Sequence, residues 1–425
     1  MNRKIAPPIK DAVDYTLTLK PYTFFHLDNG IPVYMVDAGT QPVFQLEFVY
    51  RAGNAFENQH GIASATNFLL KNGTSTRTAF EINEAFDDYG GYCQRACYNE
   101  TSSITVHGLT KHADRLLPVA FDMLTDSIFP ESELKIFQQN ATQRLKVNLQ
   151  KGEFVAGRMI DAMLYGESHP YGKYTRFEDL DALNIDAIRQ FYNQYYLDGQ
   201  CTLFVCGQLP ADFPTRLNSI FGQLGNAKTP IAYPEHQQFR ATDRSFRIEN
   251  DLNSVQGAIR IASPFPNRHH PDYAGAAVLN TLFGGYFGSR LMSNIREDKG
   301  YTYGIYSYIQ NHIGDTAWMI STEAGKDVAE ATVQEIYNEM KRLNDSLVEQ
   351  DELLLVRNYM IGSLLGDLDG PFQIMAKWKN ILLNGLDEHY FNHSIQTIKT
   401  ISAEELQLLA KKYLKPDQFF ELIVY

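Results

Sequence analysis

The stretch Gly61–Thr74, which reads Gly-Ile-Ala-Ser-Ala-Thr-Asn-Phe-Leu-Leu-Lys-Asn-Gly-Thr, decides how the rest of the chain is interpreted. It follows a run of residues that predicts a β-strand. Its apolar residues recur at the spacing of one helix face, namely Ile62, Ala65, Leu69 and Leu70. We therefore expect a short helix after a strand, in a domain that packs helices on a sheet.

The composition is typical of a folded, acidic protein. The 425 residues suffice for about two or three domains, and an apolar content of 44% supplies large cores. A net charge of −12 argues against nucleic acid as the main ligand. The charge also fits a cavity for basic peptides, although a solvated acidic surface is the simpler explanation.

The cysteines are too few for a disulfide scaffold in a chain of this length. All stand in runs that predict strands: Cys93, Cys97, Cys201 and Cys206. We expect them to be small core residues rather than metal ligands. His389 and His393 have the i, i+4 spacing of a helical metal pair, but no third ligand stands at a motif spacing. We therefore expect no metal site in this chain.

The sequence contains no run of about 18 apolar residues that would cross a membrane. Residues 1–24 form a polar leader without the hydrophobic segment of a signal peptide. We therefore expect a cytoplasmic protein with no membrane span and no nucleic-acid partner.

The order of the predicted elements repeats along the chain. Ile82 and Phe86, on one helix face, recur at a constant offset as Leu291 and Ile295. Strands arrive in adjacent pairs rather than alternating with helices. We expect an α+β fold made of two homologous α/β-sandwich domains, each a mainly antiparallel sheet with helices packed on one side.

We place an N-terminal domain at 1–225, a linker at 226–243 and a C-terminal domain at 244–425. The wider stretch 208–243 is interpreted as the connection between the halves. It is polar and contains prolines, which interrupt regular structure: Pro210, Pro214, Pro230 and Pro234.

The frame of Gly61–Thr74 resembles the zinc helix of the pitrilysin/insulinase peptidases, which reads Gly-Leu-Ala-His-x-x-Glu-His-x-x-Phe-Lys-Gly-Thr. In that H-x-x-E-H motif two histidines bind zinc and the glutamate activates the bound water. The corresponding positions here are Ser64, Asn67 and Phe68. A hydroxyl and an amide are weak zinc ligands, and a phenyl ring is none. The resemblance thus implies a peptidase-like fold with a degenerate motif and without its own metal or catalytic base.

The resemblance extends over nearly the whole chain. It includes Phe129–Glu131, His169–Gly172, Tyr195–Leu197 and the glycine-rich segment that starts at Gly284. The family takes its third zinc ligand, a glutamate, from a later helix, and the corresponding segment 140–145 contains no carboxylate.

Within segment 140–145, Gln143 or Arg144 occupies the position that the family gives to its third zinc ligand. An arginine there would repel a divalent cation. All the ligands are therefore replaced, which implies that any zinc lies in a separate catalytic chain.

One functional pair of the family is retained. Its second half carries an arginine and, seven residues later, a tyrosine that contact the substrate and the developing oxyanion, and these match Arg296 and Tyr303. An arginine offers a planar donor fork to a peptide carbonyl, and a tyrosine hydroxyl donates to an oxyanion. Without the resemblance, a helix-capping arginine and a core tyrosine would be the simpler interpretation.

Two functions follow from the resemblance. In the first, the chain is the non-catalytic subunit of a heteromeric zinc peptidase: it encloses the peptide substrate and supplies Arg296 and Tyr303 to a partner that holds the zinc. In the second, it is a peptide-binding or structural homodimer without a role in proteolysis. In both cases the chain alone has no catalytic residues of its own and is expected to be inactive.

Overall fold

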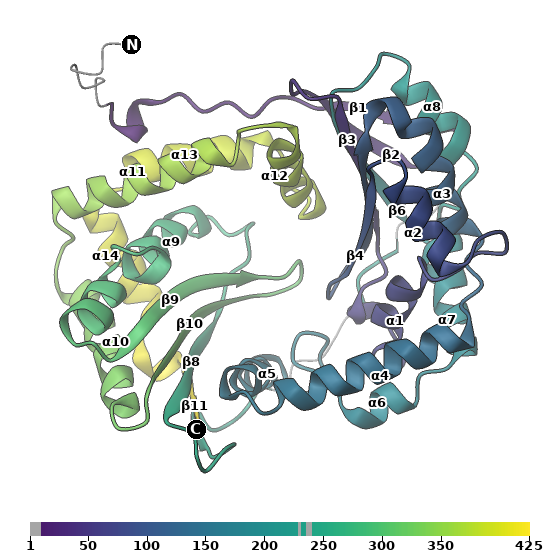
Figure 1. The fold of residues 1–425 in the computed structure, drawn as a ribbon. Coiled ribbons are helices and arrows are strands. Elements are labelled where there is room, and N and C mark those ends of the chain that lie inside the picture. Colours follow the sequence, from purple (N-terminus) through teal and green to yellow (C-terminus); the bar gives the residue numbers. More distant parts are fainter. Residues whose placement is uncertain (1–9, 228–230, 235–239) are drawn as a thin grey trace, which may run out of the picture.

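A computed structural model describes residues 10–227, 231–234 and 240–425 (Figure 1). These residues form a six-stranded and a five-stranded sheet. The first sheet has the order β1-β2-β6-β3-β5-β4. Its strands are β1 (Thr23–His26), β2 (Pro32–Asp37), β3 (Val43–Tyr50), β4 (Tyr92–Cys97), β5 (Ser102–Leu109) and β6 (Cys201–Gly207).

The second sheet repeats the topology of the first. Its order is β7-β11-β8-β10-β9, formed by β7 (Ser245–Ile248), β8 (Gln256–Phe265), β9 (Thr302–Asn311), β10 (Thr316–Gly325) and β11 (Phe420–Val424). Neighbouring strands are antiparallel except the pairs β2–β6 and β7–β11, which are parallel. With β1 set aside, each strand of one sheet has a counterpart in the other. The predicted internal repeat and fold class are therefore confirmed.

Each sheet carries helices of its own half on one face (Figure 1). In the first half these are α1 (Ile62–Leu69), α2 (Ala79–Asp87), α3 (Ala113–Thr125), α7 (Ile185–Tyr192) and α8 (Phe213–Phe221). Helix α4 (Glu131–Asn148) packs on α1, and α6 (Phe177–Asp181) packs on α4. In the second half the helices on the sheet are α9 (Tyr273–Asn280), α10 (Ala329–Asp345), α11 (Gln350–Gly366), α13 (Glu388–Thr400) and α14 (Ala403–Tyr413). Side chains alternate between the two faces of the sheet along β3, and every second one, Phe44, Leu46 and Phe48, is fully buried in the core beneath the helices. This alternation explains why the helices cover that face.

The opposite face of each sheet receives a helix from the other half. Helix α5 (Gly152–Tyr165) packs on β8 and β11, where Ala156 and Ile160 share a buried cluster with Ala258 and Leu422. Helix α12 (Pro371–Leu383) packs in the same way on β2 and β6. The two halves are thus joined by an exchange of helices in addition to the chain connection.

Two segments differ from what the sequence predicts. The polar leader is in part structured: Leu17 and Leu19 are buried in the core of the second half, and β1 follows them. The proline-containing stretch 208–243 begins with α8, whose Phe213 and Phe221 are buried under the first sheet. Proline is tolerated in this helix because Pro214 stands in its first turn, where its missing N–H has no intrahelical acceptor.

The predicted linker 226–243 lies partly outside the described residues. We therefore define the halves by their sheets, β1–β6 and β7–β11. None of the helices in the described ranges is long and apolar enough to cross a membrane.

Candidate functional site

Helix α1 is held by a buried carboxylate at its N-terminus. The backbone N–H groups of Gly61 and Ala63 both donate to Glu57 Oε2 at 3.1 Å. Lys173 Nζ and His60 Nδ1 lie 2.9 and 2.8 Å from the other oxygen. Although burial alone would raise it, the hydrogen bonds from His60 and Lys173 hold the pKa of Glu57 below its ordinary value. The negative charge of Glu57 also interacts favourably with the N-terminus of α1, which is the positive end of the helix dipole.

The structure places the three degenerate motif positions on one side of α1. Ser64 is exposed, whereas Asn67 is 3% exposed. The Asn67 amide donates to the Ser103 carbonyl at 3.2 Å and to the Tyr196 hydroxyl at 3.4 Å. The ring of Phe68 packs on that of Phe137 from α4, with 5.1 Å between centroids. Asn67 thus ties α1 to β5, and Phe68 ties it to α4.

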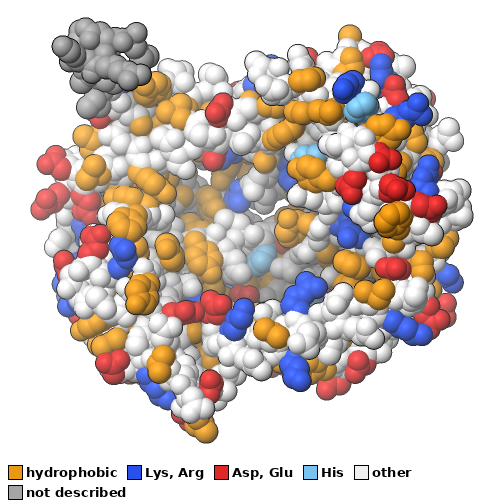
Figure 2. Space-filling view, viewed as in Figure 1, with side chains coloured by type: hydrophobic (Ala, Val, Ile, Leu, Met, Phe, Trp, Pro, Cys, Tyr) orange, Lys and Arg blue, Asp and Glu red, His pale blue; other side chains and the backbone are white. Residues whose placement is uncertain are grey.

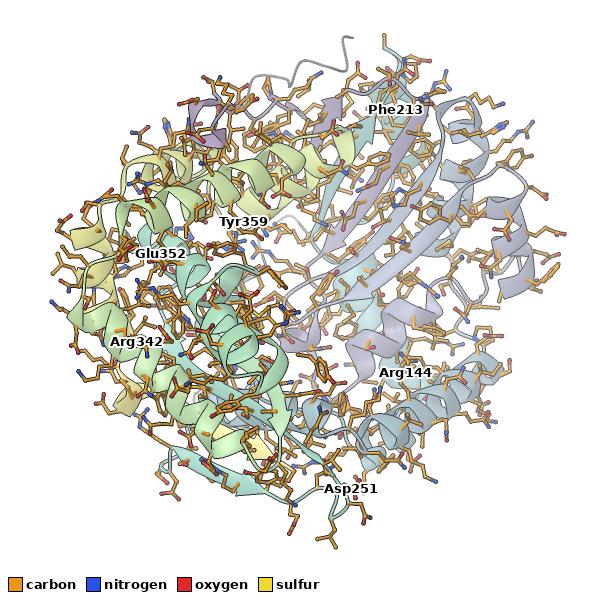
Figure 3. The ribbon with its side chains drawn as sticks, turned by 60° about the vertical axis from the view of Figure 1, so that its left-hand side comes forward. Arg144, Phe213, Asp251, Arg342, Glu352 and Tyr359 are labelled. Atoms are coloured by element: carbon orange, nitrogen blue, oxygen red, sulfur yellow. The ribbon has the colours of Figure 1, made fainter. Side chains whose placement is uncertain are left out.

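These positions line a cavity of about 790 Å³ between α1, α4 and the strands β4 and β5. Arg144 lines the same cavity from α4, next to α1 (Figure 3), while Gln143 does not belong to its wall. The molecule is hollowed at its centre, and Lys or Arg and His side chains lie on the wall of that hollow (Figure 2). The structure therefore brings together the residues that the sequence placed at the three ancestral ligand positions.

The charges in the cavity are mainly positive. Arg95 from β4, Arg144 from α4 and Lys379 from α12 line it, together with one carboxylate, Glu47. Lys379 Nζ is 2.8 Å from both oxygens of Glu47, so this carboxylate is already paired. Burial lowers the pKa of His107, which keeps that imidazole neutral at pH 7.

A zinc ion does not fit this set of side chains. Zinc needs thiolate, imidazole or carboxylate ligands that converge on one point. Within residues 10–227, 231–234 and 240–425 no three His, Cys, Asp or Glu side chains are grouped to hold a metal ion. Burial raises the pKa of the Cys93 thiol to about 11 and that of Cys97 to about 12, so neither is a ready thiolate. The guanidinium groups would repel a dication.

Arg296 and Tyr303 lie in the second half, around the turn into β9. Arg296 is in the last turn of a short π-helix, Met292–Asp298, and its guanidinium stacks on Phe287 at 4.6 Å from the ring centroid. Gly300 then adopts a left-handed conformation with φ 66°, and Tyr303 emerges on β9 with 92% of its surface exposed. Neither side chain lines the cavity beside α1.

The sequence analysis missed Arg95, Glu47 and Lys379. Arg95 carries no distinctive local signal, because charged residues are common on edge strands such as β4. Glu47 and Lys379 also carry none, because they are 332 residues apart and meet only through the exchange of α12.

Comparison with known proteins agrees with this fold. Residues 182–360 match the family described as the Peptidase M16 inactive domain. A Bacillus subtilis protein, uncharacterized zinc protease YmxG, is 26% identical over 409 residues, which cover 95% of this chain and 98% of that protein.

Solved structures show the same architecture. A peptidase M16 inactive domain from Pseudomonas fluorescens superposes with a TM-score of 0.85 at 21% identity, covering 95% of this chain and 98% of that one. A protease from Helicobacter pylori gives a TM-score of 0.85 at 17% identity, covering 96% and 100%.

The fold and the site define a peptidase-like protein whose metal positions hold other side chains. The chain is similar to the pitrilysin/insulinase peptidases, the M16 family, and its residues 182–360 match the inactive domain of that family.

Proposed function

We propose that this chain is the non-catalytic subunit of a two-chain zinc peptidase. A partner of the same family holds the zinc, and the two chains enclose the peptide. The motif positions of this chain in the α1 cavity, Ser64, Asn67 and Phe68, supply neither a zinc ligand nor a catalytic base, so hydrolysis occurs at the partner's metal.

The observation that carries the proposal is the exposure of Tyr303. A tyrosine that is 92% exposed buries little apolar surface within its own chain. It lies on an edge strand, close in sequence to an arginine that Phe287 holds by stacking. Tyr303 is an exposed donor, and Arg296 is half-buried, with its guanidinium 3.8 Å from Glu297. Donors held on rigid elements are suited to act on a group outside the chain. The donors serve a carbonyl and its oxyanion, as in peptide hydrolysis.

The free edge of the first sheet supports a role in holding peptides. Strand β4 is the last strand of its sheet, and β5 occupies only one of its sides. An extended peptide can add to such an edge through backbone hydrogen bonds. The edge lies beside the α1 cavity, since Gln94, Arg95 and Ala96 of β4 belong to the cavity wall.

The test uses the catalytic partner from the native host. The chain is co-purified, the chain that carries H-x-x-E-H is identified, and the two are mixed and assayed on a peptide with and without a chelator. We expect no turnover by this chain alone and chelator-sensitive turnover by the mixture. Tyr303→Phe removes one oxyanion donor, which typically lowers kcat by about a hundredfold or more.

Tyr306→Phe is the matched control, because Tyr306 lies on the same strand and is 55% exposed. It should leave turnover unchanged, and both variants should elute with the partner as wild type does. Arg296→Gln should lower kcat/KM, with partial rescue by Arg296→Lys. Full activity of the mixture with both Tyr303→Phe and Arg296→Gln would refute the role proposed for the pair.

A peptide-holding homodimer is the second candidate. It is favoured by one observation: the α1 cavity keeps a volume of about 790 Å³ although its metal positions are replaced. Sedimentation of the pure chain distinguishes the two, because this candidate requires a stable dimer that binds peptide without any partner.

We also propose a reducing compartment, which fits the cytoplasm. All four cysteines are free thiols in the structure, and three of them are buried. Proteins of oxidising compartments more often convert cysteines to disulfides. Fractionation of host cells tests this location.

A further inference from the structure

We propose that the α1 cavity, where relatives bind a metal cation, binds an anion in this chain: the carboxylate of an extended peptide. The proposal concerns binding by this chain alone, so it does not depend on a catalytic partner or on Arg296 and Tyr303. It is carried by the charges of the cavity wall, by the partners of those charges, and by the position of the free strand edge.

Arg95 is fixed in the cavity wall by neutral groups. Its guanidinium donates to the Phe68 carbonyl and, at 2.9 Å, to Asn72 Oδ1. It also stacks on the Phe68 ring, 4.6 Å from the centroid. These contacts orient the guanidinium without neutralising it. A guanidinium stays protonated in proteins, so a positive charge is held in place beside α1.

Arg144 supplies a second positive charge from the facing helix. It lies two turns along α4 from Phe137, on the same face, and both line the cavity. Among the described residues Arg144 makes no ion pair, whereas Lys135 on the same helix pairs with Glu131. Its side chain is exposed and can turn toward a ligand in the cavity.

The remaining titratable groups of the wall do not balance these charges. Glu47 is paired by Lys379, with 2.8 Å between Nζ and each oxygen. His107 is neutral at pH 7, and Cys93 and Cys97 remain thiols, for the reasons given above. Two guanidinium charges are therefore left over. The wall is cationic in a protein whose net charge is −12. The negative net charge of the protein suggests a basic peptide as the ligand, but the charged side chains left over in this cavity are positive and favour an anion.

A carboxylate is the anion that this geometry favours. Guanidinium groups bind carboxylates through two parallel hydrogen bonds, which are stronger than neutral ones. A peptide that added to β4 would present every second side chain on the side of the sheet where Arg95 lies. An Asp or Glu at one such position would reach the cavity. The C-terminal carboxylate of a peptide has the same chemistry, and the experiment separates the two sources.

The test measures binding of fluorescein-labelled peptides to the full chain by anisotropy. The probes are a short β-prone peptide with one central Glu, its Gln counterpart, and the Glu peptide with an amidated C-terminus. We expect the Glu peptide to bind about tenfold more tightly than the Gln peptide, which corresponds to the lower end of a charge-assisted hydrogen bond. The preference should weaken as salt is raised.

Arg144→Gln should abolish the preference, and Arg144→Lys should keep part of it. Lys146→Gln is the matched control: it makes the same charge change on the same helix at an exposed residue outside the cavity wall. Arg95→Gln should have the same effect as Arg144→Gln. Because Arg95 also supports α1, the Arg95→Gln result is used only if the variant has the thermal unfolding midpoint of the wild type. If the midpoint falls, the test rests on the Arg144 variants alone.

Each outcome decides the proposal. Loss of the preference in Arg144→Gln but not in Lys146→Gln supports it. If amidation, rather than Glu to Gln, removes the tighter binding, the proposal stands with the C-terminal carboxylate as the ligand. Equal binding of all peptides, no binding of any, or an unchanged preference in Arg144→Gln would overturn it. None of these outcomes bears on turnover in the mixed enzyme, so this inference and the proposed function fail separately.

Discussion

Replacing Lys379 by methionine should destabilise the protein far more than an ordinary surface substitution. Lys379 reaches from α12 to Glu47 on β3, and its Nζ lies 2.8 Å from both carboxylate oxygens. The Glu47 side chain is only 6% exposed, while that of Lys379 is 29% exposed. The pair therefore fastens the exchanged helix of the second half to the sheet of the first.

The expected size follows from what each substitution leaves behind. Lys379→Met strands a buried carboxylate without a counter-ion, which costs about 3–5 kcal/mol of unfolding free energy. This is a large share of the roughly 5–15 kcal/mol that a domain has. In the double variant Glu47→Gln/Lys379→Met no charge is stranded, so most of the lost stability should return. A double-mutant cycle measures this coupling.

Urea unfolding followed by tryptophan fluorescence is the assay. Trp378 precedes Lys379 on α12, and its Nε1 donates to the Lys20 carbonyl at 2.7 Å, so its emission reports whether α12 is docked. Trp318→Phe removes the other tryptophan. The free energy of unfolding is expected to fall by about 3 kcal/mol per molar urea. A loss of about 3–5 kcal/mol should therefore lower the urea midpoint of Lys379→Met by about 1 M or more.

Lys377→Met is the control on the same helix. Its ion pair with Asp367 involves a carboxylate that is 53% exposed, and such pairs contribute about 0–1 kcal/mol. Equal midpoints for Lys379→Met and Lys377→Met would refute the reasoning, as would a double variant no more stable than Lys379→Met.

Two further predictions concern stability. Burial raises the pKa of Asp161 on α5 from 3.8 to about 7, so between these values the folded protein holds a proton that the unfolded chain has lost, and stability falls as pH rises. Thermal midpoints at about pH 5 and pH 7.5 should show this fall, and Asp161→Asn should reduce it; an unchanged slope would contradict the assignment. A Cβ at Gly53 would lie 2.5 Å from the carbonyl oxygens of Tyr98 and Asn99, so Gly53→Ala should cost about 1–3 kcal/mol in chemical denaturation. Gly157→Ala, within α5 and with nothing within 4 Å, should instead be neutral or stabilising by up to about 1 kcal/mol, and equal effects of the two variants would contradict this explanation.

Local periodicity predicted most of the helices and strands, although β1 and α8 were not predicted. The spacing of Ile82 and Phe86 identifies a helix face, and both residues are buried, as are their counterparts Leu291 and Ile295. The three motif positions of α1 and Arg144 line one cavity, as their places in the family frame imply. A helix face is readable because it depends on residues a few positions apart, whereas the position of Arg144 relative to α1 came from the family resemblance.

Contacts between distant segments were not predictable in this way. Nothing near Lys379 in the sequence indicates Glu47, and nothing in the leader indicates that Leu17 and Leu19 are buried in the second half. The sign of charge in the cavity was also missed, because the net charge of a chain says little about two arginines that converge from different elements. The roles of Arg296 and Tyr303 remain predictions that the mixed-enzyme assay tests.

The exchange of α5 and α12 makes the two halves dependent on each other during synthesis. When the ribosome has finished β6, one apolar face of the first sheet still lacks α12, which is made near the end of the chain. Meanwhile α5 is already complete, but the strands it covers do not yet exist. The nascent protein must therefore keep both surfaces from aggregating until translation is nearly over. If the repeat arose by duplication, this exchange would have prevented the two copies from separating again. A gene cut between them would encode a first fragment without α12 and a second fragment without α5, so each sheet would lack the helix that covers one of its faces.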